Sequence, residues 1–253
     1  MRAFLKKEYM ELCRSGRLLM LVLIFALFGI MNPAMAKLTP WLMETLSDSL
    51  AEAGFATMDV TVDAMTSWAQ FYKNIPMGLI FFVLLFFGSF TGEYQKGTLV
   101  PVVTKGLSRR KIVLAKSLVA SASWTASYWL CFGITYGYNA FFWDNRIAAH
   151  LLFAGALTWL FGIWITALLL FFSTVAQSGT QVLFGTGGVA MGVYLLGMFP
   201  KLGGYLPVKL LDGLSLLHGA AGPEDYYIGM AAALSMVVLC MVSALVCFDR
   251  KGL

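Results

Sequence analysis

Six long stretches without a single Asp, Glu, Lys or Arg limit what this chain can fold into. They are residues 18–36, 75–92, 117–140, 147–173, 180–200 and 226–248. Because a helix needs roughly 20 apolar residues to cross the hydrocarbon core of a bilayer, each stretch can form one transmembrane helix. Transmembrane β-strands are about 10 residues long and alternate in polarity, unlike these continuous runs. The sequence therefore predicts an all-α membrane protein with six transmembrane helices.

The composition agrees with this prediction. Of the 253 residues, 59% are hydrophobic and 12% are charged, whereas soluble domains contain about 25% charged residues. No repeat of fixed period is visible, so we expect a single transmembrane domain over residues 1–253. Within it we expect an interfacial amphipathic helix (1–17), an extracellular loop (37–74), a cytoplasmic coupling segment (92–117) and an extracellular re-entrant-like segment (201–225).

The basic residues predict how the chain is oriented. Thirteen of the 18 Lys and Arg residues fall in residues 2–17, 96–116 and 250–251. Cytoplasmic segments of membrane proteins are enriched in these residues, so we expect both termini on the cytoplasmic side of the membrane. Seven aromatic residues are expected at the outer interface: Trp41, Trp68, Tyr72, Trp143, Tyr205, Tyr226 and Tyr227.

Two local features refine the first part of the chain. Asn32 and Pro33 are expected to kink or end the first span, because proline lacks a backbone N–H. The preceding residues form a basic amphipathic helix on the inner leaflet. Its lipid-facing residues are predicted to be Phe4, Leu5, Tyr9 and Leu12.

Motifs for catalysis or metal binding are absent from the sequence. The spans contain no Asp, Glu, Lys or Arg, which proton relays and intramembrane active sites usually require. The chain has no G-x-x-x-x-G-K-[ST] loop for ATP, no H-E-x-x-H, no G-x-S-x-G and no cluster of Cys and His. We therefore expect no catalytic residue, no metal site and no cofactor bound by this chain.

Two patterns within the spans have alternative interpretations. Ser117, Ser121, Thr125 and Tyr128 share one helix face, which favours hydrogen bonds between helices, and the alternative is the lining of a substrate path. Gly188 and Gly192 form a G-x-x-x-G motif, which predicts close helix packing within the chain or between protomers.

The connector between the second and third spans contains several local signals. Residues 93–103 are predicted to form a short helix that is interrupted at Gly97 and ends near Pro101. Thr98 is expected to cap the next turn, and Ser108 is a suitable N-cap for the helix that continues into the third span. A short helix across the cytoplasmic face has the shape of a docking element.

These residues carry a resemblance to a known family. Glu93, Gly97-Thr98-Leu99, Gly106-Leu107-Ser108-Arg109, Ile112 and Lys116 resemble the motif that follows the second span in permease subunits of the ABC-2 family of ABC transporters. The chain departs from that motif after Leu99, where Val-Pro-Val-Val replaces a longer aliphatic run. The resemblance implies an ATPase-coupling role for Glu93, Gly97, Thr98, Leu99, Pro101, Arg109 and Arg110. It also implies that Glu93 pairs with Arg109, with Arg110 or with the ATPase.

The resemblance further implies a fold like that of type V exporters and a permease that works as a dimer in a bacterial plasma membrane. Two separate cytoplasmic ABC ATPase subunits would bind ATP and Mg. The expected activity is export of a hydrophobic or amphipathic substrate such as a peptide, drug or lipid, because the spans offer no charge for an ionic ligand. Membrane lipids are expected partners and nucleic acid is not. The alternatives are an ATPase-independent secondary carrier or channel, and a membrane scaffold or immunity protein.

Overall fold

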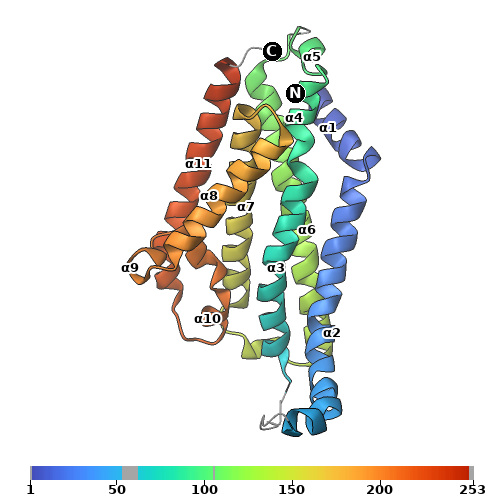
Figure 1. The fold of residues 1–253 in the computed structure, drawn as a ribbon, viewed down its shortest axis with the longest axis vertical. Coiled ribbons are helices and arrows are strands. Elements are labelled where there is room, and N and C mark those ends of the chain that lie inside the picture. The colour runs from blue at the N-terminus through green and yellow to red at the C-terminus, as the bar shows by residue number, and fades with distance from the viewer. Residues whose placement is uncertain (1, 53–61, 105, 251–253) are drawn as a thin grey trace.

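The computed structural model describes residues 2–52, 62–104 and 106–250, and their secondary structure is entirely helical. The helices are α1 (Arg2–Arg14), α2 (Arg17–Glu52), α3 (Ala64–Phe86), α4 (Gly88–Gln95), α5 (Val100–Thr104), α6 (Arg109–Phe142), α7 (Leu151–Val175), α8 (Gly179–Gly197), α9 (Pro200–Gly203), α10 (Gly213–Leu217) and α11 (Tyr227–Arg250), with short 3-10 turns at η1 (Asn145–Ile147), η2 (Pro207–Leu211) and η3 (Pro223–Tyr226). Figure 1 shows that α1, α4, α5 and the end of α11 gather at one end of the molecule. The all-α prediction is confirmed for the described residues.

Five segments of the described chain are long and apolar enough to cross a membrane. They are Arg17–Trp41, Ala64–Gln95, Leu151–Val175, Gly179–Gly197 and Pro223–Arg250. These candidate spans overlap five of the six predicted ones. The remaining predicted span, residues 117–140, lies in the 34-residue helix α6, which is less apolar because serine, threonine and asparagine side chains follow its buried face.

The first predicted loop is shorter than expected, because two helices extend into it. Helix α2 continues through Pro33 and Pro40 to Glu52, and α3 already begins at Ala64. The prediction that Asn32 and Pro33 could end the first span is therefore wrong. Residues 53–61 of the predicted loop lie outside the described residues, and an extracellular location for the rest stays a prediction.

A hydroxyl group from α6 explains how α2 passes through Pro33. In an α-helix, the carbonyl of Gly29 would accept a hydrogen bond from the N–H that Pro33 lacks. Thr135 Oγ1 on α6 donates to this carbonyl at 3.1 Å instead. Asn32 Nδ2 donates to Thr135 Oγ1 at 3.1 Å, and Asn74 Nδ2 on α3 donates to Asn32 Oδ1 at 2.8 Å. These polar groups therefore join α2, α3 and α6 in the bundle interior.

Aromatic side chains form much of the core between α3, α6 and α7. Trp68 is fully buried against Phe71 and Phe132. Tyr72 and Tyr226 are also buried, so these three aromatic residues face the protein interior, and their level at the outer membrane interface stays a prediction. Burial is favoured because each large ring removes much apolar surface from its surroundings and packs edge to face with its neighbours.

The segment between α8 and α11 folds back onto α7 in short helices. Leu210, Leu216 and Leu217 are buried there. Thr158 Oγ1 on α7 donates to the carbonyl of Leu210 at 3.3 Å, and the Tyr226 hydroxyl donates to the carbonyl of Asp212 at 2.7 Å. The segment is thus tied to the bundle, and its re-entry into the bilayer stays a prediction.

Candidate functional site

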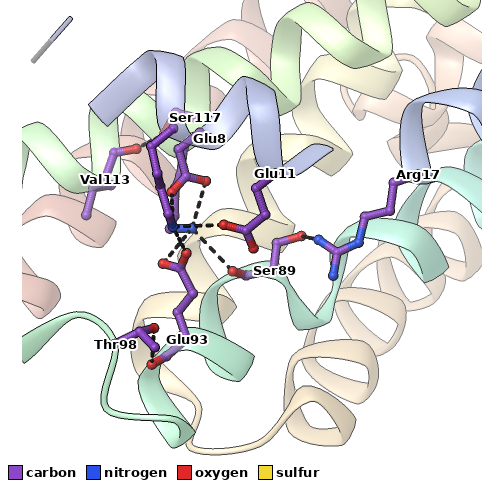
Figure 2. Close-up of polar contacts among 10 residues, drawn as sticks. Glu8, Glu11, Arg17, Ser89, Glu93, Thr98, Val113 and Ser117 are labelled. Carbon is purple, nitrogen blue, oxygen red and sulfur yellow. Dashed lines mark hydrogen bonds and ion pairs between the residues drawn. The ribbon is translucent and has the colours of Figure 1, made fainter. Parts of the chain in front are cut away.

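Five charged side chains meet where α1, α4 and α6 come together. We call Lys7, Glu8, Glu11, Glu93 and Lys116 the ionic cluster. Figure 2 shows the carboxylates of Glu8, Glu11 and Glu93 directed toward one point. Helix α1 supplies three members of the cluster at helical spacing, whereas Glu93 follows the second predicted span and Lys116 precedes the third.

The two lysines bridge the three carboxylates. Lys116 Nζ lies 2.9 Å from Glu8 Oε2 and 3.0 Å from Glu93 Oε2. The latter pair is close without being aligned for a hydrogen bond. Lys7 Nζ contacts Glu93 and lies 3.1 Å from Glu8 Oε1 and 2.8 Å from Glu11 Oε2. Every member of the cluster therefore has an oppositely charged partner.

Burial makes these pairings necessary. Lys116 and Glu93 are only 5% and 7% exposed, and an unpaired charge in such a place costs several kcal/mol, of the order of 3–5. Burial by itself would lower the pKa of Lys7, but hydrogen bonds to Glu11 and Glu93 outweigh it and raise this pKa. Burial opposes the charged form of Glu11 as well, yet the hydrogen bond from Lys7 leaves the pKa of Glu11 lowered.

The carboxylates also lie close enough together to suggest a metal site. Oxygen atoms of Glu8, Glu11 and Glu93 lie within 4.8 Å of one another. The ammonium groups of Lys7 and Lys116 contact these same oxygens and compensate two of the three negative charges. We therefore interpret the group as an ion-pair network and assign no metal to it.

The partners of Glu93 differ from those predicted. They are lysines of α1 and α6, whereas Arg109 and Arg110 face the end of α11. Arg110 Nε lies 2.6 Å from Asp249 Oδ2, and Arg109 donates to the carbonyl of Asp249 at 3.1 Å. The reason is position along the helix: Lys116 lies about two turns, or 10.5 Å, beyond Arg109 on the same face of α6, so Lys116 reaches Glu93 while Arg109 lies level with the end of α11.

The connector after Glu93 is folded, but not as predicted. Gly97 has a φ of 66° in the turn between α4 and α5, a conformation that favours glycine. Thr98 Oγ1 donates to the carbonyl of Glu93 at 3.1 Å, so it caps the end of α4 and not the next helix. Pro101 is the second residue of α5 and does not end a helix. Ser108 is the N-cap of α6 in backbone position, without a side-chain hydrogen bond.

A small hydrophobic cluster packs Leu99 of the connector against residues of α1, α4, α6 and α11. Its buried members are Phe4, Phe90, Leu99, Ile112, Val113, Ala115, Ala244 and Phe248. Leu99 is 1% exposed, and the rings of Phe90 and Phe248 pack edge to face at 5.0 Å.

Phe4 and Leu12 are buried against the protein, so the prediction that these two residues face lipid is wrong. Tyr9 is exposed, as predicted.

Six residues of the connector form an exposed surface that we call the docking ridge. It consists of Gln95, Lys96, Gly97, Thr98, Val100 and Pro101. Gln95 Nε2 donates to the carbonyl of Gln177 at 3.1 Å, which attaches the ridge to the connection between α7 and α8. Glu93 and Leu99 thus anchor this surface from inside, while Gly97, Thr98 and Pro101 lie on it.

The polar face of α6 makes contacts within its own helix and with α7. Ser117 Oγ donates to the carbonyl of Val113 at 2.7 Å. Thr125 Oγ1 donates to the carbonyl of Ser121 at 2.8 Å and accepts from Trp159 Nε1 at 3.0 Å.

The Tyr128 hydroxyl donates to the carbonyl of Gly155 on α7 at 2.7 Å. Thr125 and Tyr128 thus make the predicted hydrogen bonds between helices, whereas the Ser117 hydroxyl bonds within α6 and Ser121 contributes only its backbone carbonyl. A role in lining a substrate path stays a prediction.

Among the described residues, no atom outside α8 would lie within 4 Å of a Cβ at Gly188 or Gly192, so close packing of this motif within the chain is not observed.

The contribution of α1 to the site was not predicted from the sequence. Helix α1 was expected to face lipid, whereas Lys7 pairs with Glu93, and Glu8 and Glu11 share the lysines of the cluster with it. Two signals were present in the sequence. Lys7 and Glu11 are four residues apart on one helix face, and Lys116 adjoins a long uncharged stretch, where a basic side chain needs an acidic partner if it is buried.

The fold and these contacts define an all-helical, multi-pass membrane protein whose N-terminal helix is joined by ion pairs to the connector after its second long apolar segment. Residues 2–253 match the model of a family described as ABC-2 family transporter protein. The chain therefore belongs to this family, whose members are components of membrane transport systems.

One curated relative is also similar over nearly its whole length. It is the uncharacterized transmembrane protein YxlG of Bacillus subtilis (strain 168). The two sequences are 24% identical over 251 residues, which cover 96% of this chain and 93% of the relative.

Proposed function

We propose that this chain is the permease subunit of an ATP-binding-cassette exporter. In this proposal, two permease copies work with separate cytoplasmic ATPase subunits, which bind ATP and Mg and supply the energy. Both termini lie on the cytoplasmic side of a bacterial plasma membrane. The family match supports a transport role, and the geometry of the connector supports the site of coupling.

We count α6 as the sixth helix that crosses the membrane. At 34 residues, α6 has a length of about 51 Å, which exceeds the roughly 30 Å hydrocarbon core. Ser117, Tyr128 and Thr135 bond to carbonyls of α6 itself, α7 and α2, which removes the main cost of placing these polar side chains in a bilayer.

The observation that carries the proposal is the construction of the connector. Its docking ridge is exposed, while Glu93 and Leu99 on either side of the Gly97 turn are buried in the ionic cluster and the hydrophobic cluster. A solvated loop that only joins two spans needs neither anchor. An element that transmits force from an ATPase needs a stiff connection to the bundle, which both anchors supply.

The open face of α8 supports a dimer. Gly188 and Gly192 leave a flat surface on this helix, and Phe184 and Met191 beside them are exposed. G-x-x-x-G surfaces allow two helices in a membrane to approach closely. We place the contact with a second permease copy here.

We propose a hydrophobic or amphipathic substrate, because the six apolar stretches contain no Asp, Glu, Lys or Arg that could bind an ionic one.

A co-purification experiment tests the proposal. The full chain is expressed with an ABC ATPase encoded beside it, and the ATPase retained on the tagged permease is quantified. Lys96→Glu with Val100→Asp changes the docking ridge without touching its anchors, and we expect at least a tenfold loss of retained ATPase. Lys201→Glu with Leu202→Asp on α9 is the matched control, because both residues are also exposed, and it should retain the ATPase.

Equal retention by the ridge variant and the control would refute the docking assignment. Transport by the purified chain in vesicles that are supplied with an ion gradient but no ATPase would favour a secondary carrier or channel. Stable binding of a partner without transport under any condition would favour a scaffold or immunity protein.

A further inference from the structure

An apolar groove runs between α1 and α6, on a face of α1 next to the one that carries the ionic cluster. It has a volume of about 350 Å³. Its walls include Leu5 and Tyr9 of α1, Leu18 of α2, and Leu118, Ala122 and Ala126 of α6. The α6 residues extend over about 12 Å along the helix. No acidic residue lines the groove among the described residues.

Two exposed lysines mark one end of this groove. Lys111 precedes Leu118 by seven residues, so it lies on the same face of α6 about two turns, or 10.5 Å, closer to the helix start. Lys6 directly follows Leu5 on α1. Helices α1 and α6 run side by side in the same direction, because Glu8 contacts Lys116 and Phe4 shares a hydrophobic cluster with Ile112. Lys6 and Lys111 therefore both lie toward the starts of their helices, just outside the residues that line the groove. In the described part of the chain, neither lysine forms a salt bridge.

We propose that this groove is a specific site for an anionic phospholipid. One acyl chain lies along Leu118, Ala122 and Ala126, and the phosphate lies between the ammonium groups of Lys6 and Lys111. The two parts of the site match the two parts of such a lipid. Basic residues near a membrane surface attract anionic headgroups, and lysine stems can cover apolar surface while the charge stays at the headgroup level.

The bound lipid would act on the ionic cluster through α1. Helix α1 contributes Leu5 and Tyr9 to the groove, and Lys7, Glu8 and Glu11 to the cluster on the neighbouring face. A lipid that fills the groove holds α1 against α6 and thereby keeps Glu8 within reach of Lys116. The anionic lipid is thus a structural ligand that stabilises the support of the connector, whether or not the chain works with an ATPase.

Native mass spectrometry of the full chain in detergent tests this site. The protein is titrated with phosphatidylglycerol and with phosphatidylcholine carrying identical acyl chains. Each lysine near an anionic group is expected to contribute roughly fivefold in affinity. Lys6→Gln with Lys111→Gln should therefore weaken phosphatidylglycerol binding about 25-fold and leave phosphatidylcholine binding unchanged. Lys37→Gln with Lys201→Gln removes the same charge from two other exposed positions and should change neither.

A second variant tests the apolar part. Ala122→Phe fills the groove with a ring at an exposed position of α6 and should weaken the binding of both lipids. Equal affinity of the unmodified protein for the two lipids would overturn the proposal, as would a loss in the control variant as large as that in Lys6→Gln with Lys111→Gln. Displacement of the lipid by glycerol 3-phosphate at equal concentration would show that only a phosphate is bound and would also overturn it.

Discussion

Replacing Lys116 with methionine should be among the most damaging single changes at the ionic cluster. Lys116 is 5% exposed, and its ammonium group contacts Glu8 at 2.9 Å and Glu93 at 3.0 Å. Methionine has a similar length but no charge, so the cluster would keep three carboxylates and one ammonium group. Removing one partner of a buried ion pair costs about 3–5 kcal/mol. Because Lys7 still contacts both glutamates, we expect a loss near the lower value, about 3 kcal/mol.

Replacing Glu93 with glutamine should cost much less. It leaves two carboxylates and two ammonium groups, and Lys116 keeps Glu8 while Lys7 keeps Glu11. We expect a loss of about 1 kcal/mol, the typical net contribution of one hydrogen bond. In the double variant, the loss should be smaller than the sum of the two single losses by about 1–2 kcal/mol, because the two side chains are in contact.

The assay is unfolding of the full chain in mixed micelles, with increasing denaturing detergent and tryptophan fluorescence as the signal. The free energy of unfolding is compared for the two single variants, the double variant and Lys73→Met, an exposed control for which no loss is expected. Equal losses for Lys116→Met and Glu93→Gln would refute the charge argument. Strict additivity in the double variant would refute a direct interaction between the two side chains.

Three further predictions use the same assay. Leu99→Ala should cost about 2–4 kcal/mol because this side chain is 1% exposed, whereas Val100→Ala, 43% exposed, should cost less than about 0.5 kcal/mol; similar losses would contradict the buried anchor. Gly162→Ala should cost about 1–3 kcal/mol, since its Cβ would lie 2.1 Å from a tryptophan ring, and Gly133→Ala, which meets nothing within 4 Å, should cost nothing. Finally, the lowered pKa of Glu11 gives a stabilising contribution that is present above the unfolded value near 4.5 and is lost as the pH falls through the lowered pKa. The midpoint of unfolding should therefore drop below about pH 4.5, and Glu11→Gln should flatten that drop; an identical acid limb in this variant would contradict the assignment.

Sequence patterns identified those features that depend on residues close together in the sequence. Five of the six predicted spans correspond to helices that are long and apolar enough to cross a membrane, because a long uncharged run has few alternatives to a helix in a bilayer. The N-cap position of Ser108 and the turn at Gly97 were also found correctly, since backbone conformation there depends on the residues themselves.

The candidate site was predicted only in part. The sequence pointed to Glu93 and its connector, but it suggested arginines as partners and a lipid-facing α1. Ion pairs between distant segments depend on which faces of α1, α4 and α6 meet, and residue spacing within one helix does not specify this. The same limit applies to Leu99, which was predicted to contact a partner and is buried in this structure.

Pro33 illustrates the division between sequence and tertiary structure. The sequence by itself determined a long apolar segment with a proline that removes one hydrogen bond, and it determined that the chain belongs in a membrane. Only the tertiary structure decided that the helix continues, because Thr135 from α6 donates to the carbonyl of Gly29 that Pro33 leaves without its usual partner. In the same way, the charge of Glu93 follows from the sequence, whereas its burial beside Lys7 and Lys116 follows from the packing of three helices, because a buried charge is stable only where folding brings its partners to it.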